Sequence, residues 1–338
     1  MNIGMAVRRY GPVGGMEGVA LAFSRWLVQQ GHQVDVFCAD AVTESDGVRM
    51  RSLPAGGRGV MWKAVSLQRA MSALPVDNYD GFLHFERGGR GGTFRAGGGC
   101  HAAWAEHRTK KWFDGWLSRI DKDAMVDSER VVVNSQMAMA DVERHYAIPN
   151  NKLCLVRNGV DLQRFQPGTV SASPYVVFLG ADFQRKGLAT AIAAVSQIRD
   201  LSLKVIGAGR GDFSALASKL GVSDRVEFLG HIESPEHVLA SAQAMILPTR
   251  YDPSSNACLE AMACGVPVVT TKYNGAAEIL PHPWMIVSEP EDVEGCAEVL
   301  QRVLSFPKLG EECRAVAEKY SMHSSFSQLF AVLLEGSA

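Results

Sequence analysis

Short apolar runs alternate along this chain with longer segments whose apolar residues recur at helical spacing. In the first half of the chain, the apolar runs predict strands at 2–7, 33–38, 81–85 and 130–134. In the second half, they predict strands at 176–180, 203–207, 225–229, 244–247, 266–270 and 285–287. Residues 41–74 give only a weak pattern. Because strands alternate with helices, we expect an α/β fold with two parallel sheets, helices on both faces of each, and a cleft between them.

Composition narrows the class of protein. The 338 residues suit about two domains. A net charge of −2 gives no general basic field, so we expect no nucleic-acid partner. No run of about 18 apolar residues is present and the N-terminus does not resemble a signal peptide, so we expect a cytoplasmic protein. The seven cysteines are scattered, which is typical of reduced, buried thiols.

Residues 246–271 combine a strand, a turn-rich loop, a short helix at 256–263 and another strand. Ser254 and Ser255 stand at the N-cap position, and the free N–H groups of a helix N-terminus favour an anion such as phosphate. Glu260 lies one turn inside this helix, where its carboxylate would accept hydrogen bonds from hydroxyl groups. The stretch therefore predicts a ligand with phosphates and sugar hydroxyls; the alternative is a buried helix with an ordinary cap.

The spacing Asp252-x7-Glu260, followed by AMACGVPVV, resembles the carboxylate-x7-carboxylate motif of retaining glycosyltransferases of family 4, whose fold is called GT-B. The resemblance implies that Glu260 holds the nucleotide ribose and that Asp252 contacts the transferred sugar. Family members usually have Glu at the first position, where this chain has the shorter Asp252. This difference leaves the identity of the donor sugar open.

Residues 178–187, FLGADFQRKG, resemble the family segment whose basic residues bind the donor diphosphate. Some members have Arg directly after the first Gly, where this chain has Ala181, so Arg185 and Lys186 must supply the positive charge. Two cations oppose the dipole at a helix start, which favours a functional interpretation over a merely solvated turn. The glycine turn at 207–211 and the loop at 273–278 are also similar to family segments near the donor.

Two glycine-rich segments stand out in the first half. Gly14 and Gly15 precede a helix expected at 17–30, and there they let a backbone approach a ligand. A dinucleotide-binding interpretation is disfavoured, because the glycines are not spaced as Gly-x-Gly-x-x-Gly. Residues 95–104, RAGGGCHAAW, resemble bacterial family 4 transferases close to the lipopolysaccharide core glucosyltransferases, although an Asp is common where Gly98 stands.

His101 is the candidate side chain of that second segment. It would project from a helix start toward the sugar; the alternative is a helix cap or a core histidine. Cys100 beside it does not suit a nucleophile pair, because neighbouring helical residues diverge. The Asp121-Lys122-Asp123 run is not expected to bind a metal for the same reason.

The resemblance also sets domain boundaries. We expect an N-terminal Rossmann-like acceptor domain at 1–165, a C-terminal Rossmann-like nucleotide-sugar donor domain at 166–320, and a last helix at 321–338 that returns to the first domain. Residues 167–174, PGTVSASP, have the composition of a linker.

The resemblance implies a retaining, metal-independent hexosyltransferase without a cofactor. A UDP-sugar is the favoured donor, and the acceptor is a hydroxyl of a glycan or lipid-linked molecule of the cell envelope, such as lipopolysaccharide. A GT-B epimerase or phosphorylase and a non-catalytic sugar-nucleotide-binding protein are the alternatives. The expected catalytic residues are His101, Arg185, Lys186 and Asp252. The expected donor-binding residues are Gly14, Gly15, Gly180, Arg185, Lys186, Gly207, Ser255, Asn256, Ala257 and Glu260.

Basic and aromatic residues are interleaved between 104 and 122, in WAEHRTKKWFDGWLSRIDK. Trp beside Lys and Arg is typical of segments that settle at a lipid headgroup boundary. We therefore expect peripheral contact with an anionic membrane or its acceptor; the alternative is a helix with its aromatics in the core. The expected patch consists of Arg108, Lys110, Lys111, Trp112, Trp116 and Arg119.

Overall fold

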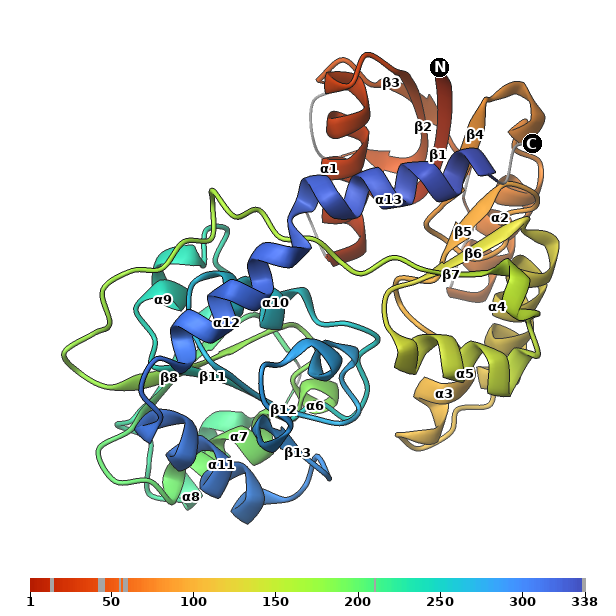
Figure 1. Ribbon diagram of the computed structural model, residues 1–338. Coiled ribbons are helices and arrows are strands. Elements are labelled where there is room, and N and C mark those ends of the chain that lie inside the picture. Colours follow the sequence, from red (N-terminus) through yellow and green to blue (C-terminus); the bar gives the residue numbers. More distant parts are fainter. Residues whose placement is uncertain (13–14, 42–45, 55, 57–59, 210, 336–338) are drawn as a thin grey trace. The chain divides into compact units, whose positions relative to one another are not determined.

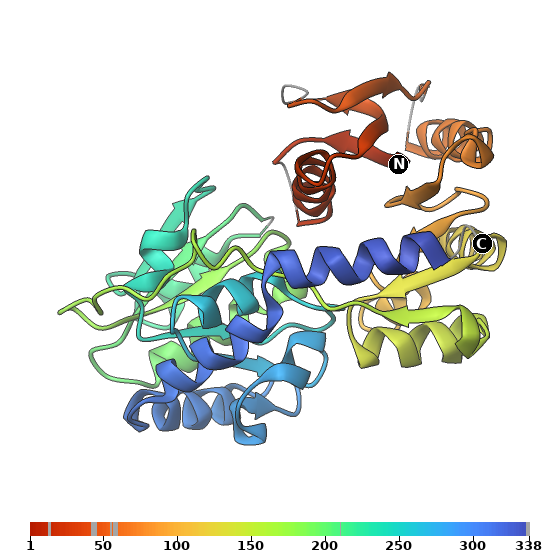
Figure 2. The ribbon, with the colours of Figure 1, turned by 45° about the horizontal axis from the view of Figure 1, so that its top comes forward.

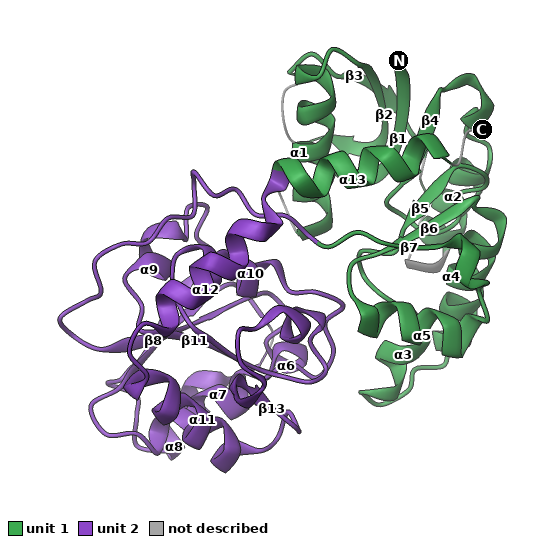
Figure 3. Ribbon diagram, in the orientation of Figure 1, with its two compact units in different colours: residues 1–157, 323–338 green, residues 158–322 purple. Residues whose placement is uncertain are grey.

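The structure is a computed structural model that describes residues 1–12, 15–41, 46–54, 56, 60–209 and 211–335. The chain forms two compact units (Figure 3). The first unit contains residues 1–157 and 323–338, and the second contains residues 158–322.

The first unit is built on a seven-stranded sheet in which all paired strands are parallel (Figure 1). Its strands are β1 (Asn2–Tyr10), β2 (Gln33–Ala41), β3 (Arg49–Ser52), β4 (Gly81–His84), β5 (Thr93–Arg95), β6 (Arg130–Val133) and β7 (Leu153–Leu155). Its helices are α1 (Gly15–Gln29), α2 (Val60–Ser72), α3 (His101–Glu106), α4 (Asp114–Asp127) and α5 (Gln136–Tyr146), with short 3₁₀ turns η1 (Val76–Asn78) and η2 (Asn150–Lys152). The strand order β3-β2-β1-β4-β5-β6-β7 reverses direction between β1 and β4.

The second unit has a six-stranded parallel sheet in the order β10-β9-β8-β11-β12-β13. Its strands are β8 (Tyr175–Leu179), β9 (Ser202–Ile206), β10 (Val226–Gly230), β11 (Ala244–Leu247), β12 (Val268–Thr271) and β13 (Ile286–Val287). Its helices are α6 (Phe183–Lys186), α7 (Leu188–Ser196), α8 (Phe213–Lys219), α9 (Glu236–Ala240), α10 (Asn256–Ala263), α11 (Val293–Ser305) and α12 (Leu309–Ala317), with 3₁₀ turns η3 (Gly275–Ile279), η4 (Pro283–Met285) and η5 (Glu318–Tyr320).

Continuous apolar sequence explains the central strands. Every residue of β11 and β12 is buried, as expected for strands covered by helices on both faces. The expected α/β class with two parallel sheets is confirmed.

The boundary between the units lies after Arg157 rather than at residue 165. Residues 158–165 belong to the second unit because their contacts are there. Asn158 donates a hydrogen bond to the carbonyl of Ser254 (3.0 Å), Val160 forms a β-bridge with Ser321, and Phe165 lies in the second unit's core.

The last helix, α13 (Met322–Glu335), packs on the first unit from its second residue onward (Figure 2). The ring of Phe326 lies 5.3 Å from Phe23 of α1, and the Trp26 indole donates a hydrogen bond to Nδ1 of His323 (3.1 Å). The apolar side of this helix therefore completes the core of the first unit.

Candidate functional site

The second unit has its strand-order reversal between β8 and β11. In parallel α/β sheets, ligands bind beyond the carboxyl ends of the strands at such a reversal, because the loops there diverge to opposite faces. The segment after β8 carries Arg185 and Lys186 in the short helix α6, and the loop after β11 carries Asp252. The residues expected for catalysis in this unit therefore share one edge of the sheet.

Close backbone packing fixes the loop after β8 against the loop after β11. Gly187 has φ = 80°, and a Cβ atom there would lie 2.0 Å from the carbonyl oxygen of Pro248. The carbonyl of Arg185 accepts hydrogen bonds from the backbone N–H of Arg250 (2.8 Å) and from the hydroxyl of Thr249 (3.1 Å). Only glycine suits position 187, and these contacts join the two segments.

The two expected cations are oriented by that packing. Arg185 donates from Nη1 to the carbonyl of Tyr251 (3.0 Å). The Nζ atom of Lys186 forms an ion pair with the carboxylate of Asp252, and both residues are buried. Lys186 and Asp252 were predicted from separate motifs, and the fold brings them into direct contact.

Asn274 holds the loop around Asp252, a role that the sequence did not reveal. Its fully buried amide oxygen accepts from the N–H of Ser255 (3.2 Å) and Ala276 (3.1 Å), and its amide nitrogen donates to the Thr270 hydroxyl (3.0 Å). The backbone beside it pairs with both sides of Asp252, since Asp252 N–H donates to Tyr273 (2.9 Å) and Gly275 N–H donates to Asp252 (2.9 Å). The sequence did carry one signal for this role: the loop at 273–278 resembles a family loop with two glycines, and it has Asn at position 274.

The N-terminus of α10 is not capped by a side chain as the sequence predicts. Ser255 is the N-cap residue, but its side chain makes no capping hydrogen bond. The position is instead fixed by Asn274 and by Asn158, whose amide donates to the side-chain oxygen of Asn256 (2.7 Å). Ala257 follows in the first turn, so the expected residues 255–257 do form a helix start at this edge.

Glu260 lies in the next turn of α10 and is partly buried. The pKa of its carboxyl is raised to about 7, chiefly by burial; Arg164 and Lys186 lower this pKa and Glu236 raises it. Ligand hydroxyls that donate hydrogen bonds to this carboxylate would stabilise its charged form.

The two expected glycines of this unit pack against each other. Gly207 has φ = 127°, and a Cβ atom there would lie 2.1 Å from the carbonyl oxygen of Gly180. Gly180 in turn donates to the carbonyl of Ile206 (3.0 Å). Gly180 and Gly207 let the segments after β8 and β9 approach closely, so the contacts seen in the structure are those of backbone packing.

In the first unit, His101 begins α3 inside a network of charged groups. Its Nε2 atom lies 3.0 Å from Oδ1 of Asp114, and its backbone N–H donates to Oδ2 of Asp121 (2.9 Å). Burial lowers the pKa of His101. A neutral ring that donates from Nε2 to Asp114 leaves Nδ1 as the hydrogen-bond acceptor.

Comparison with protein families decides the class. Residues 13–164 match the model described as Glycosyltransferase Family 4, and residues 173–305 match the model described as Glycosyl transferases group 1. Together these matches cover most of the chain. The chain belongs to glycosyltransferase family 4.

Relatives of this family 4 chain include an uncharacterized glycosyltransferase of Methanocaldococcus jannaschii, which is 25% identical over 90% of this chain and 89% of its own length. The lipopolysaccharide glucosyltransferase WaaG of Escherichia coli is 24% identical over 58% of this chain and 60% of its own length.

Solved structures share the fold. A crystal structure of WaaG, a glycosyltransferase involved in lipopolysaccharide biosynthesis, has a TM-score of 0.80 at 19% identity and covers 98% of this chain and 99% of that chain. The Anabaena protein HepE, in complex with UDP-glucose, has a TM-score of 0.77 at 16% identity and covers 99% of this chain and 100% of that chain. The expected GT-B architecture of two Rossmann-like α/β domains is confirmed.

Of the two glycines expected before the first helix, Gly14 lies outside the described residues, and Gly15 is the first residue of α1.

The expected membrane patch is divided by the fold. Arg108 is not a surface cation: Nη1 donates to Oδ2 of Asp114 (3.0 Å), and only 17% of its side chain is exposed. The reason is a turn at residues 107–113, which folds Arg108 back onto the first residue of α4. Trp116 is partly buried, whereas Lys110, Lys111, Arg119 and Trp112 are exposed, Trp112 by 83%.

Among the helices that the structure describes, none has the length and apolar character needed to span a bilayer.

Proposed function

We propose that the protein is a retaining glycosyltransferase that transfers a sugar from a UDP-sugar to a hydroxyl of a glycan or lipid-linked acceptor in cell-envelope synthesis. The observation that carries this proposal is the meeting of Arg185, Lys186 and Asp252 at the strand-order reversal of the second unit, with Glu260 in the helix that follows. The likeness to HepE, whose structure holds UDP-glucose, supports UDP as the nucleotide. The sequence relation to WaaG supports an acceptor of the lipopolysaccharide type.

The proposed reaction breaks the bond between the sugar C1 and the diphosphate oxygen, and the electron pair leaves with the diphosphate. The acceptor oxygen bonds to C1 on the same face and gives its proton to the departing phosphate, so the configuration is retained. Arg185 and Lys186 stabilise the growing negative charge, which is the role that a metal ion has in other transferases. His101 keeps the sugar-positioning role implied by the family resemblance.

Peripheral binding at the cytoplasmic face of the inner membrane belongs to the same proposal. Lys110, Lys111, Trp112 and Arg119 are the exposed residues that support it. Each basic residue near an anionic surface contributes about 1 kcal/mol.

Incubation with UDP-, GDP- and ADP-sugars, followed by detection of the released nucleotide, tests the donor. We expect slow hydrolysis of UDP-sugars and equal rates with and without EDTA. With a simple alcohol as the acceptor, the glycoside formed should have the donor's anomeric configuration by NMR. Glu260→Gln serves as the control and should be inactive. A glycoside with inverted configuration, or loss of activity in EDTA, would contradict the mechanism. Release of nucleotide from GDP- or ADP-sugars alone would contradict the choice of uridine as the base.

A further inference from the structure

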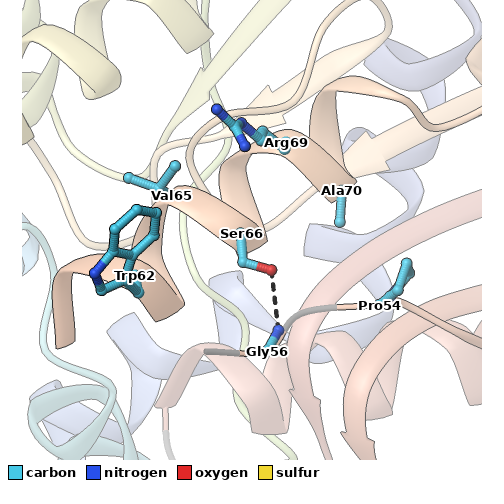
Figure 4. A pocket seen from close by; sticks show the side chains of 7 residues that line it. All are labelled: Pro54, Gly56, Trp62, Val65, Ser66, Arg69 and Ala70. Carbon is cyan, nitrogen blue, oxygen red and sulfur yellow. Dashed lines mark hydrogen bonds between the residues drawn. The ribbon is translucent and has the colours of Figure 1, made fainter. Parts of the chain in front are cut away.

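A pocket of about 610 Å³ lies in the first unit, between the loop that follows β3 and helix α2 (Figure 4). The described residues that line it are Pro54, Gly56, Trp62, Val65, Ser66, Arg69 and Ala70. None of these residues belongs to the site described above, and residues 41–74 gave only a weak sequence pattern.

Helix α2 presents one side to the pocket. Trp62, Ser66 and Arg69 are spaced i, i+4 and i+7, so they lie along one stripe of the helix. Ser66 accepts a hydrogen bond from the N–H of Gly56 (3.0 Å), which ties the loop to the helix (Figure 4). This side of α2 therefore presents an indole ring, a hydroxyl group that is already hydrogen-bonded to Gly56, and a guanidinium group.

Trp62 is 68% exposed, which is unusual for the largest apolar side chain. Val65, Ala70 and Pro54 complete an apolar wall beside it. A flat, exposed indole next to such a wall suits a ring whose faces carry C–H groups while its polar substituents stay in water. A sugar ring has this character.

Arg69 gives the pocket a positive charge beside this apolar wall. It has no hydrogen-bond or ion-pair partner within the described part of the chain, whereas Arg87 and Arg90 pair with Asp121 and Asp127. A neighbouring hollow shares Val65 and Arg69 and adds Arg90. No acidic residue is found among the described residues that line either hollow. A guanidinium that no described residue pairs with favours an anionic group, which it binds in bidentate fashion.

The pocket lies on the side of the sheet where the strands end. Pro54 follows the carboxyl end of the edge strand β3, and Trp62 lies in the first turn of α2. Ligands of parallel α/β sheets bind outside the carboxyl ends of the strands, and β3 is separated by β2 from the strand β1 at which the strand order reverses.

We propose that this pocket binds a phosphorylated sugar of the acceptor, with the sugar ring stacked on Trp62 and the phosphate bound by Arg69. This inference rests on the proposed function, because it names part of the acceptor. It predicts that the acceptor is an anionic glycan and that recognition of it belongs to the first unit.

Direct binding of glucose 6-phosphate, measured by calorimetry, tests the proposal. We expect saturable binding that is at least 10-fold tighter than binding of glucose or of inorganic phosphate, since a charge-assisted hydrogen bond adds to the stacking. Trp62→Ala and Arg69→Gln should each weaken binding about 10-fold or more, whereas Trp62→Phe should restore most of it. Both side chains are exposed, so these variants should fold normally.

A matched control separates the pocket from general charge effects. Lys63→Gln changes an exposed cation of α2 outside the pocket. This variant should bind like the wild type. Equal binding of glucose and glucose 6-phosphate, equal losses in the Lys63→Gln control, or wild-type binding by Arg69→Gln would each overturn the proposal. Tighter binding of phosphatidylglycerol vesicles that depends on Arg69 would assign the site to a lipid phosphate instead and would also overturn it.

UDP-glucose hydrolysis by the same proteins distinguishes the two proposals. If the wild type and all pocket variants hydrolyse UDP-glucose alike but glucose 6-phosphate does not bind, only the pocket assignment fails. If glucose 6-phosphate binds through Trp62 and Arg69 but no nucleotide sugar is used, only the proposed transferase function fails.

Discussion

The Nζ atom of Lys186 and the carboxylate of Asp252 form an ion pair in which Lys186 is 8% exposed and Asp252 is 6% exposed. Lys186 ends helix α6 after β8, and Asp252 lies in the loop after β11. An ammonium group has three donors, so Lys186 can hold Asp252 and still donate to a diphosphate. The pair thus has two roles, because it joins the two loops and also orients the cation.

Lys186→Ala is expected to lower both stability and donor affinity. The substitution leaves Asp252 buried without its partner, which typically costs about 3–5 kcal/mol. Loss of a charge-assisted hydrogen bond to the diphosphate should weaken UDP-glucose binding by about 10–150-fold. Urea unfolding and calorimetry measure the two effects.

The double variant Lys186→Ala/Asp252→Asn separates these effects. With the carboxylate neutralised, most of the lost stability should return, while donor affinity should stay low. Recovery of UDP-glucose binding in the double variant would show that Lys186 acts only by balancing Asp252.

The pKa of Glu260 predicts a pH-dependent stability. Burial raises this pKa to about 7, above the ordinary value for Glu in an unfolded chain. Between about pH 4.5 and pH 7 the folded protein therefore holds a proton that the unfolded chain has released. The stability that Glu260 contributes is fully present below this range and is lost as the pH rises through 7, by at most about 3–4 kcal/mol.

Unfolding of the wild type and of Glu260→Gln across this range provides the test. Because Gln does not titrate, the difference in stability should shift in favour of Glu260→Gln as the pH rises. A constant difference from pH 4.5 to pH 8 would contradict the raised pKa. Saturating UDP-glucose should reduce the effect, because ribose hydroxyls that donate to the carboxylate favour its charged form.

The sequence predicted the second unit better than the first, for a physical reason. The strand at 244–247 and the helix at 256–263 have the bounds predicted for them, because each is a continuous buried segment between turn residues. Strand β3 escaped prediction because all four of its residues are exposed, so no apolar pattern marks this edge strand. Strand β5 also escaped prediction, because it is only three residues long and stands among glycines.

Side-chain partners were harder to predict than elements. The motif spacing placed Lys186 and Asp252 in one site, but their direct contact depends on how two loops distant in sequence pack. The interleaved basic and aromatic residues from 104 to 122 predict a surface patch that includes Arg108. The turn at 107–113 places Arg108 against Asp114 instead.

Asn274 should be essential for the shape of the donor loop. Asn274→Ala leaves the N–H groups of Ser255 and Ala276 without their buried acceptor and removes the donor to the Thr270 hydroxyl, which still donates to the carbonyl of Leu247. We expect a loss of about 2–4 kcal/mol in unfolding free energy, together with a raised KM for the donor. Asn151→Ala, which changes an exposed Asn of the first unit, should leave both quantities unchanged. Wild-type stability of Asn274→Ala would show that the loop is held by its backbone pairing alone.

Membrane contact is expected to depend on Lys110, Lys111 and Arg119, which are exposed beside the 83%-exposed Trp112. Three cations near an anionic surface give roughly 3 kcal/mol at low ionic strength, which suffices for weak binding and is screened by salt. In flotation with phosphatidylglycerol vesicles, the wild type should float at low salt and remain in the load fraction at high salt. Changing all three cations to Glu should abolish flotation.

Arg108 provides the matched control for this experiment. It lies in the same segment but is paired with Asp114, so it cannot contribute a free charge to the surface. Arg108→Gln should therefore reduce stability, because the Asp114 carboxylate loses its main partner, yet the fraction that stays folded should float like the wild type. Flotation that persists in the triple Glu variant would exclude this patch as the membrane contact.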